Sequence, residues 1–370
     1  MTPTFLSVVG ARPNFMKLAP LARALAGRPA VRHIVVHTGQ HYDAELSDDF
    51  FRDLAIPAPE CNLGVGSGSH GQQTGAIMQR LEPLCVELRP DVVIVYGDVN
   101  STVAAALVAA KLGVRVAHVE AGLRSRDWSM PEEINRAVTD RVSDLLFAPS
   151  RDAVANLRGE GVAPERIHFV GNVMIDSLVT ALPAARAAGT PARYGVAGCP
   201  YTLVTLHRPS NVDDPVVLGE LVETLTALAA ETPVLFPLHP RTRARLEAAG
   251  LRNGGGEPGT HALRWLDPMP YLDMLSLVLS AGVVVTDSGG LQEETTYLGV
   301  PCVTVRPGTE RPITCLEGTN RLVPPRREAI ERAVHEARRT RPGAPPVIER
   351  WDGDAAARIA TVLCDGGRFD

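Results

Sequence analysis

The feature that most constrains this chain is a repeated alternation of short apolar runs with amphipathic segments. Thr4–Val9 is such a run, and Phe15, Leu18, Ala22 and Leu25 then recur at helical spacing. The succession of apolar run, polar loop and helical pattern continues to about residue 180. Chains that alternate strands and helices in this way build parallel sheets covered by helices, so we expect an α/β fold.

A stretch rich in Ala, Pro and Gly at residues 181–200 interrupts the alternation, which then starts again. Two series predict two doubly wound parallel-sheet domains that face each other across a cleft. We place the domains at residues 1–173 and 174–370, with 181–200 as a linker-like stretch, and the final helix could pack back on the N-terminal domain. The expected strands are 4–9, 33–37, 91–96, 114–118, 145–148, 167–170, 201–206, 234–237, 263–266, 282–286 and 300–305.

Composition narrows the function classes. The 370-residue chain has a formal net charge of −5, which argues against nucleic acid or an anionic membrane as the main partner. The six cysteines are scattered without a CxxC pair, which favours small buried side chains over disulfides or metal ligands. The first apolar run is too short for a signal peptide, and no run reaches the ~20 residues of a membrane-spanning helix. We therefore expect a cytoplasmic protein without a metal site.

Carboxylates follow two successive predicted strands. Asp98 comes after the run DVVIVYG, and Glu120 comes directly after the next strand. Ligands of open α/β sheets bind outside the carboxyl ends of the strands, and close carboxylates push their pKa values apart, which suits acid/base work. A second pair, Glu132 and Glu133, lies on the following loop. The alternatives are an ordinary charged loop and, for Asp98, an N-cap of the helix that begins near Asn100.

Basic groups surround the first strand–helix turn. The segment Gly10–Asn14 leads into a helix that carries Lys17 in its first turn, and Arg12 lies beside it. Free N–H groups at a helix N-terminus bind anions, and Arg and Lys would clamp a phosphate there. The alternative is a pair of solvated surface charges.

The second series has its own candidate site. His207 ends its first strand and suggests an acid/base group or a phosphate ligand, with a structural histidine as the alternative. The strand Gly282–Thr286 runs into Ser288-Gly289-Gly290, whose N–H groups could cradle a phosphate, and Glu294 could accept hydrogen bonds from ribose. A plain strand–helix turn is the alternative. Arg311 adds a further cation.

Taken together, these motifs resemble the non-hydrolysing UDP-N-acetylglucosamine 2-epimerases. The matching stretches run in order from Gly10 to Pro312 and cover most of the chain: GARPNFMKLAPL, TGQHYD, VVIVYGDVNST, HVEAGLRS, PEEINR, TLHR, TDSGGLQEE and TERP. The resemblance implies two Rossmann-like domains of the glycosyltransferase-B type, a homodimer and no cofactor. It also implies elimination of UDP to give 2-acetamidoglucal, followed by re-addition of UDP with a proton delivered to the opposite face of C2.

The resemblance also implies roles for single residues. Catalytic positions are Asp98, Glu120, Glu132 and His207, and substrate-binding positions are Arg12, Lys17, Arg136, Ser288, Gly289, Gly290, Glu294 and Arg311. Gln40 and His41 match part of an allosteric site for a second UDP-GlcNAc, but Asp43 replaces a glutamine of that pattern. Asn14 stands where many members have Glu. The alternatives are a hydrolysing epimerase that releases ManNAc and UDP, a glycosyltransferase of the same architecture, and a binding protein with a degenerate site.

Overall fold

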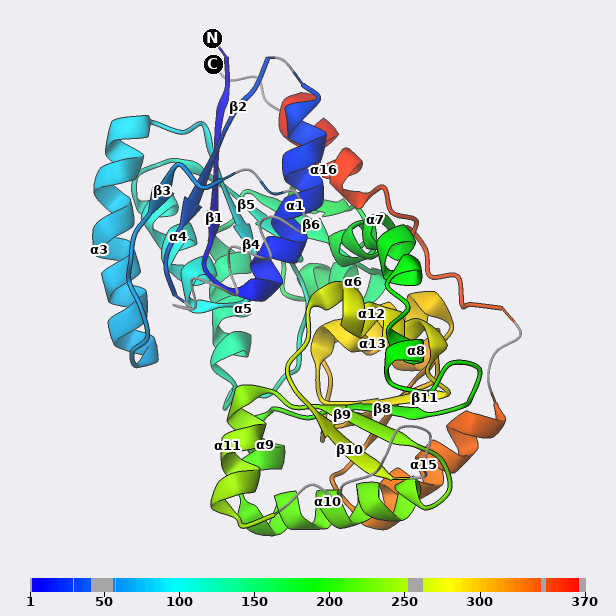
Figure 1. Ribbon diagram of the computed structural model, residues 1–370. Coiled ribbons are helices and arrows are strands. Elements are labelled where there is room, and N and C mark those ends of the chain that lie inside the picture. The colour runs from blue at the N-terminus through cyan, green and yellow to red at the C-terminus, as the bar shows by residue number, and fades with distance from the viewer. Residues whose placement is uncertain are drawn as a thin grey trace. The chain divides into compact units, whose positions relative to one another are not determined.

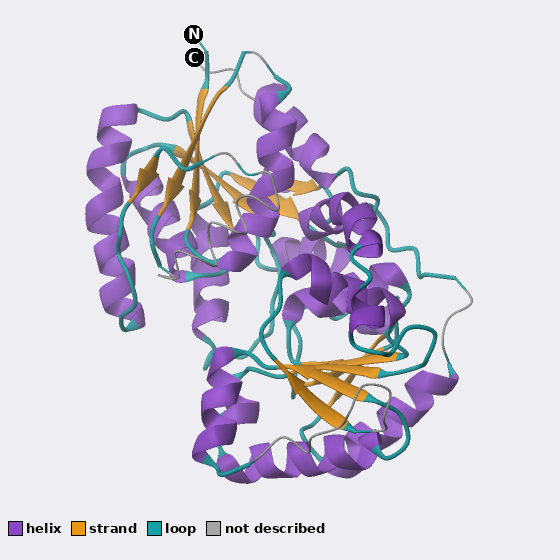
Figure 2. Ribbon diagram, in the orientation of Figure 1, coloured by secondary structure: helices purple, strands orange, loops and turns teal. Residues whose placement is uncertain are grey.

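The computed structural model describes residues 2–28, 30–40, 56, 58–251, 262–340 and 344–365 (Figure 1). The chain forms two compact units, the first made of 1–179 and 349–370 and the second of 180–348. Each unit holds one parallel sheet with helices on both faces (Figure 2), which confirms the predicted fold class of two Rossmann-like α/β domains. No helix in the described part of the chain is long and apolar enough to cross a membrane.

The sheet of the first unit has seven strands in the order β3-β2-β1-β4-β5-β6-β7. The strand order reverses between β1 and β4, so the crevice outside their carboxyl ends is where such a fold places ligands. The strands are β1 (Thr4–Val9), β2 (Arg32–His37), β3 (Cys61–Asn62), β4 (Val92–Tyr96), β5 (Arg115–Val119), β6 (Leu145–Ala148) and β7 (Ile167–Phe169). The helices are α1 (Arg12–Ala26), α3 (His70–Leu88), α4 (Asn100–Lys111), α5 (Pro131–Val142), α6 (Arg151–Gly159), the 3₁₀ turn η1 (Pro164–Arg166), α7 (Val173–Ala187) and α16 (Ala355–Asp365). Helix α7 continues past residue 179 into the second unit.

The sheet of the second unit has six strands in the order β10-β9-β8-β11-β12-β13, with its reversal between β8 and β11. The strands are β8 (Thr202–Thr205), β9 (Val234–Pro237), β10 (Leu263–Leu266), β11 (Val283–Thr286), β12 (Cys302–Val305) and β13 (Asn320–Val323). The helices are α8 (Thr190–Arg193), α9 (Pro209–Val212), α10 (Pro215–Ala229), α11 (Pro240–Ala248), α12 (Tyr271–Ser280), α13 (Gly289–Leu298), α14 (Ile313–Leu316) and α15 (Arg327–Arg339).

Most of the strands that could be predicted from the sequence are buried along most of their length. The central strands β4 and β11 are buried along their whole length and consist almost entirely of β-branched residues, the composition of strands covered on both faces. All eleven expected strands are present within a few residues. Two edge strands were not predicted. β3 is two residues long, and β13 (NRLV) is mostly half-buried and begins with two polar residues, so neither carries the continuous apolar run that marks the centre of the sheet.

The C-terminal segment returns to the first unit, where α16 packs against α1. Asp176 caps α16 by accepting the backbone N–H groups of Ala355 and Ala356. Just before it, Trp351 is buried and donates its indole N–H to the carbonyl of Pro149 at 3.1 Å. The backbone of Arg350 can lie this close to residue 171 only because that residue is glycine. A Cβ at Gly171 would lie 2.0 Å from the carbonyl oxygen of Arg350.

We predict that Gly171→Ala destabilises the first unit more than Gly113→Ala does. Both glycines have a left-handed backbone, at φ +90° and +72°, so alanine costs about 1–2 kcal/mol at either position. Only at Gly171 does the added methyl group also collide with backbone, because the Cβ position at Gly113 is open. Calorimetry should show a first unfolding transition several degrees lower for Gly171→Ala. Equal shifts for the two variants would contradict this packing.

Candidate active site

The turn after β1 is fastened to the end of β4 by Asn14. The Asn14 side chain accepts hydrogen bonds from the backbone N–H groups of Gly10 and Ala11 and donates one to the carbonyl of Tyr96 at 2.8 Å. Glutamate at this position could not donate the last bond as a carboxylate. The turn exposes Arg12 at the first position of α1. Asn14 therefore fixes the backbone at the point where the strand order reverses.

Lys17 and Glu120 form a buried ion pair beside this turn. Lys17 Nζ lies 2.6 Å from Glu120 Oε1, and both side chains are less than 5% exposed. The pair rests on Gly97, where a Cβ would lie 2.6 Å from Lys17 Nζ. Glu120 itself has φ +75°, a left-handed conformation that is costly for a residue with a side chain. Strain of this kind persists only where the surroundings impose it, and it concentrates at functional sites.

Asp98 lies at the end of the neighbouring strand, since β4 pairs with β5 with Tyr96 opposite Val119. Its carboxylate accepts a hydrogen bond from Arg136 Nε at 3.1 Å, and Asn135 donates to its backbone carbonyl. The alternative role of Asp98 as a helix cap is wrong, because α4 begins at Asn100 with Val99 as its N-cap. The two carboxylates at this edge are therefore each paired with a cation.

Of the two glutamates at the start of α5, Glu133 is the one that holds the loop. It accepts hydrogen bonds from the backbone N–H groups of Ser125 and Arg126 and pairs with Arg136 at 2.5 Å. Burial raises the pKa of Glu133, but these donors outweigh burial and lower it. Glu132 is half-buried, and the described residues offer its side chain no hydrogen-bond or ion-pair partner. The catalytic role that the resemblance implies for Glu132 stays a prediction, and the holding role of Glu133 was not predicted.

In the second unit, His207 forms a dyad with Asp287. His207 Nδ1 lies 3.0 Å from Asp287 Oδ1, and the fully buried Asp287 also accepts N–H groups of His207, Arg208 and Asn211. Burial raises the pKa of Asp287, but His207 and these donors together lower it. A carboxylate on Nδ1 fixes the tautomer and directs Nε2 outward. Asp287 was missed, although it follows β11 immediately, whereas Gly97 separates Asp98 from the end of β4.

Ser288 is the N-cap residue of α13, and its side chain makes no capping bond to that helix. Arg311 packs over the start of α13, since a Cβ at Gly289 would lie 2.6 Å from Arg311 Nη1. Arg311 is paired with Glu293 at 2.9 Å and with Glu310. A phosphate on the α13 N-terminus would therefore meet backbone N–H groups and Ser288, with Arg311 held behind them.

Glu294 lies one turn into α13 and is almost completely buried. It accepts a hydrogen bond from the hydroxyl of Tyr271 at 2.9 Å. Burial raises the pKa of Glu294 to about 7, with Glu293 adding to the rise and Tyr271 opposing it. A carboxyl group with this pKa is partly protonated near neutral pH, so it can either donate or accept a hydrogen bond.

Gln40 and His41 are the two residues predicted for allosteric binding, and the structure describes only the first of them. The Gln40 side chain is buried and accepts from the N–H and hydroxyl of Ser101, so it fastens the start of α4. His41 lies outside the described residues. The predicted positions thus form one cluster in each unit, and their convergence across a cleft stays a prediction.

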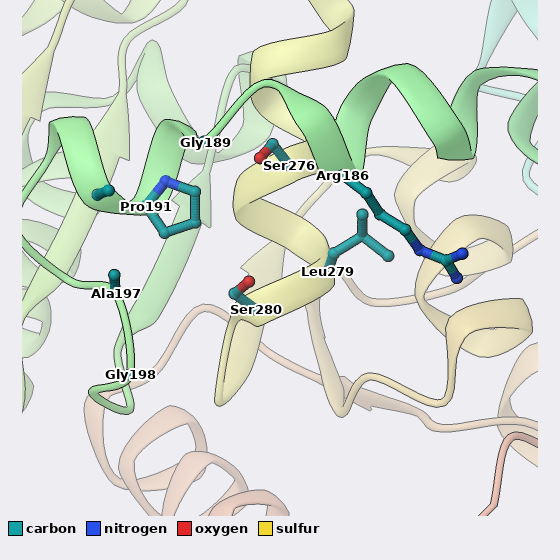
Figure 3. A pocket seen from close by; sticks show the side chains of 9 residues that line it. Arg186, Gly189, Pro191, Ala197, Gly198, Ser276, Leu279 and Ser280 are labelled. Carbon is teal, nitrogen blue, oxygen red and sulfur yellow. The ribbon is translucent and has the colours of Figure 1, made fainter.

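One open pocket of about 310 Å³ lies in the second unit between the end of α7, α8 and α12 (Figure 3). No predicted site residue lines it. Ser276 and Ser280 contribute hydroxyls, and Arg186 is its single charged residue. Figure 3 shows the Arg186 guanidinium extending away from Ala197 and Gly198, so the charge is not aimed into the pocket.

Comparison with known proteins identifies the family. The family model described as UDP-N-acetylglucosamine 2-epimerase matches residues 23–364. The chain belongs to the UDP-N-acetylglucosamine 2-epimerase family. It is 44% identical to the UDP-2,3-diacetamido-2,3-dideoxy-D-glucuronate 2-epimerase of Pseudomonas aeruginosa, over 88% of this chain and 89% of that one. It is 41% identical to the UDP-N-acetylglucosamine 2-epimerase of Methanocaldococcus jannaschii, over 88% and 90%.

Solved structures agree with this assignment. The Methanocaldococcus jannaschii UDP-GlcNAc 2-epimerase in complex with UDP-GlcNAc and UDP superposes with a TM-score of 0.89 at 39% identity, covering 98% of this chain and all of that one. The Neisseria meningitidis UDP-GlcNAc 2-epimerase bound to UDP-GlcNAc gives a TM-score of 0.85 at 27% identity, over 98% and 100%. A glycotransferase of kitacinnamycin, at 14% identity and a TM-score of 0.59 over 99% of both chains, shares the fold alone.

We predict that Glu294 makes the second unit less stable as pH rises. The folded pKa of about 7 lies above the ordinary value of 4.5, so the folded protein binds more protons in this window. The stabilisation is complete below pH 4.5 and is lost as pH rises through 7, by on the order of 3 kcal/mol. Urea unfolding at pH 5 and pH 8 should show that Glu294→Gln removes this loss, whereas Glu247→Gln, an exposed control, retains it. A Glu294→Gln variant with the wild-type pH dependence would contradict the prediction.

Proposed function

We propose that this protein interconverts UDP-GlcNAc and UDP-ManNAc without hydrolysing them. The observation that carries the proposal is the pair of carboxylates at the carboxyl ends of β4 and β5, Asp98 held by Arg136 and Glu120 held by Lys17. Inverting C2 requires one group to take a proton and another to deliver one, and two fixed carboxylates supply both. Relatives that carry the name UDP-GlcNAc 2-epimerase support the choice of substrate.

The proposed reaction has two steps, an elimination and an addition. A base removes the C2 proton, the electron pair forms the C1–C2 double bond, and the C1–oxygen bond to the diphosphate breaks, which gives 2-acetamidoglucal and UDP. In the second step a diphosphate oxygen adds back to C1 while an acid protonates C2 from the opposite face. Charge that develops on the leaving diphosphate is stabilised best by donors already in place.

The residues divide between these tasks. Asp98, Glu120 and Glu132 handle protons, and His207, oriented by Asp287, lies ready as an acid/base group or a diphosphate ligand. Arg12, Lys17 and Arg136 supply positive charge on the sugar side. The diphosphate and ribose are bound by Ser288, Gly289, Gly290 and Glu294, with Arg311 behind them. The working protein is proposed to be a homodimer.

A second candidate substrate has a specific observation in its favour. The Pseudomonas aeruginosa relative, at 44% identity, is named for UDP-2,3-diacetamido-2,3-dideoxy-D-glucuronate, which carries an amide at C3 and a carboxylate at C6. The chemistry at C2 is the same for both substrates. The choice between them depends on what contacts C3 and C6 rather than on the carboxylates at the sheet edge.

Product analysis tests the proposal. The purified protein is incubated with UDP-GlcNAc, and separately with the diacetamido-glucuronate nucleotide, and followed by proton and phosphorus NMR. UDP-ManNAc, with the diphosphate intact, is the expected product. Free ManNAc with an equal amount of UDP would overturn the non-hydrolysing assignment. If the protein turned over the diacetamido-glucuronate nucleotide but not UDP-GlcNAc, the proposed substrate would be wrong.

We predict that Asp98→Asn and Glu120→Gln each lower kcat by roughly 10²–10⁴, the usual contribution of a positioned acid or base. UDP should still bind to both variants in calorimetry, because its proposed ligands belong to the second unit. Glu87→Gln, an exposed substitution in the first unit, is the matched control and should leave kcat unchanged. Full activity of Asp98→Asn and Glu120→Gln would remove both residues from the mechanism.

A further inference from the structure

A third buried charge cluster lies behind the two carboxylates of the first unit. It joins His118, the fourth residue of β5, to Asp140 on α5 and to Arg124 in the loop between them. His118 Nδ1 lies 2.6 Å from Asp140 Oδ1, and Arg124 Nη2 lies 2.7 Å from Asp140 Oδ2. His118 has no exposed surface, and Asp140 is 1% exposed. Glu160 pairs with Arg124 from the end of α6.

Hydrogen bonds hold both ring nitrogens of His118. Its Nε2 lies 2.8 Å from the carbonyl oxygen of Gly97, and its Nδ1 lies 2.6 Å from Oδ1 of Asp140. A carbonyl oxygen can only accept, so Nε2 donates to Gly97. Asp140 Oδ2 accepts from Arg124 and from the backbone N–H of Gly122 at 3.0 Å.

The cluster fixes the two turns that carry Asp98 and Glu120. His118 holds the carbonyl of Gly97, the residue before Asp98, and Asp140 holds the N–H of Gly122, two residues after Glu120. Gly97, Glu120 and Gly122 have φ of +62°, +75° and +84°, so this backbone departs from ordinary strand geometry at three points. Conformations of this kind need specific contacts to hold them.

We propose that His118 is a positioning residue that sets the Gly97–Asp98 turn against the Glu120 turn for catalysis. This inference rests on the proposed function. A misplacement of about 1 Å between reacting groups can cost roughly 100-fold in rate. Substitution of a buried histidine with a purely structural role would change stability without changing kcat selectively.

Kinetics of two variants, His118→Asn and His118→Gln, test the positioning role. Asparagine retains a donor toward Asp140 but leaves the Gly97 carbonyl without one, whereas glutamine can still reach Gly97. His118→Asn should lower kcat about 10- to 100-fold with little change in KM or in UDP affinity, and His118→Gln should recover part of the loss. Unchanged kcat in a folded His118→Asn, or equal loss in both variants, would overturn the positioning role. Inactivity of the unmodified protein on both nucleotide sugars would instead overturn the proposed function.

Discussion

The structure of the first unit depends most directly on the ion pair between Lys17 and Glu120. Taking two charges out of water is costly, and removing one partner of a buried pair leaves the other uncompensated. The pair connects the first helix to the turn after β5 across the point where the strand order reverses. Gly97 lies beneath it without a side chain, and Glu120 accepts a left-handed backbone to reach it. The left-handed backbone of Glu120 therefore coincides with a buried electrostatic contact.

Other charged groups at the edges of both sheets are also held by an opposite charge or by hydrogen-bond donors. Asp98, Asp140 and Asp287 each lie at or behind a carboxyl end, and each is held by a cation or by several N–H donors. Donors and acceptors fixed in this way need no reorganisation when charge develops on a bound substrate. In the second unit Arg306, Glu310, Arg311 and Glu293 form a buried network of two cations and two anions behind the start of α13.

Much of this could be predicted from the sequence because it follows from local patterns. Apolar runs marked the central strands, and the rule that ligands bind at carboxyl ends directed attention to Asp98, Glu120 and Ser288. Contacts between distant segments could not be predicted. The holding role of Glu133, the pairing of Arg136 with Asp98 and the His118–Asp140 pair depend on how α5 packs against β4 and β5. The edge strand β13 was missed because it is short, mostly half-buried and only half apolar.

We propose that fixed carboxylates exchange a proton at C2 while the diphosphate leaves and returns. This exchange is measured most directly by turnover of UDP-GlcNAc in deuterated water, followed by proton NMR at the C2 position of the epimerised product. We expect UDP-ManNAc with deuterium at C2, because the proton removed on one face is replaced by a solvent-exchanged one on the other. Epimerised product that retains its original hydrogen at C2 would contradict the proposed mechanism.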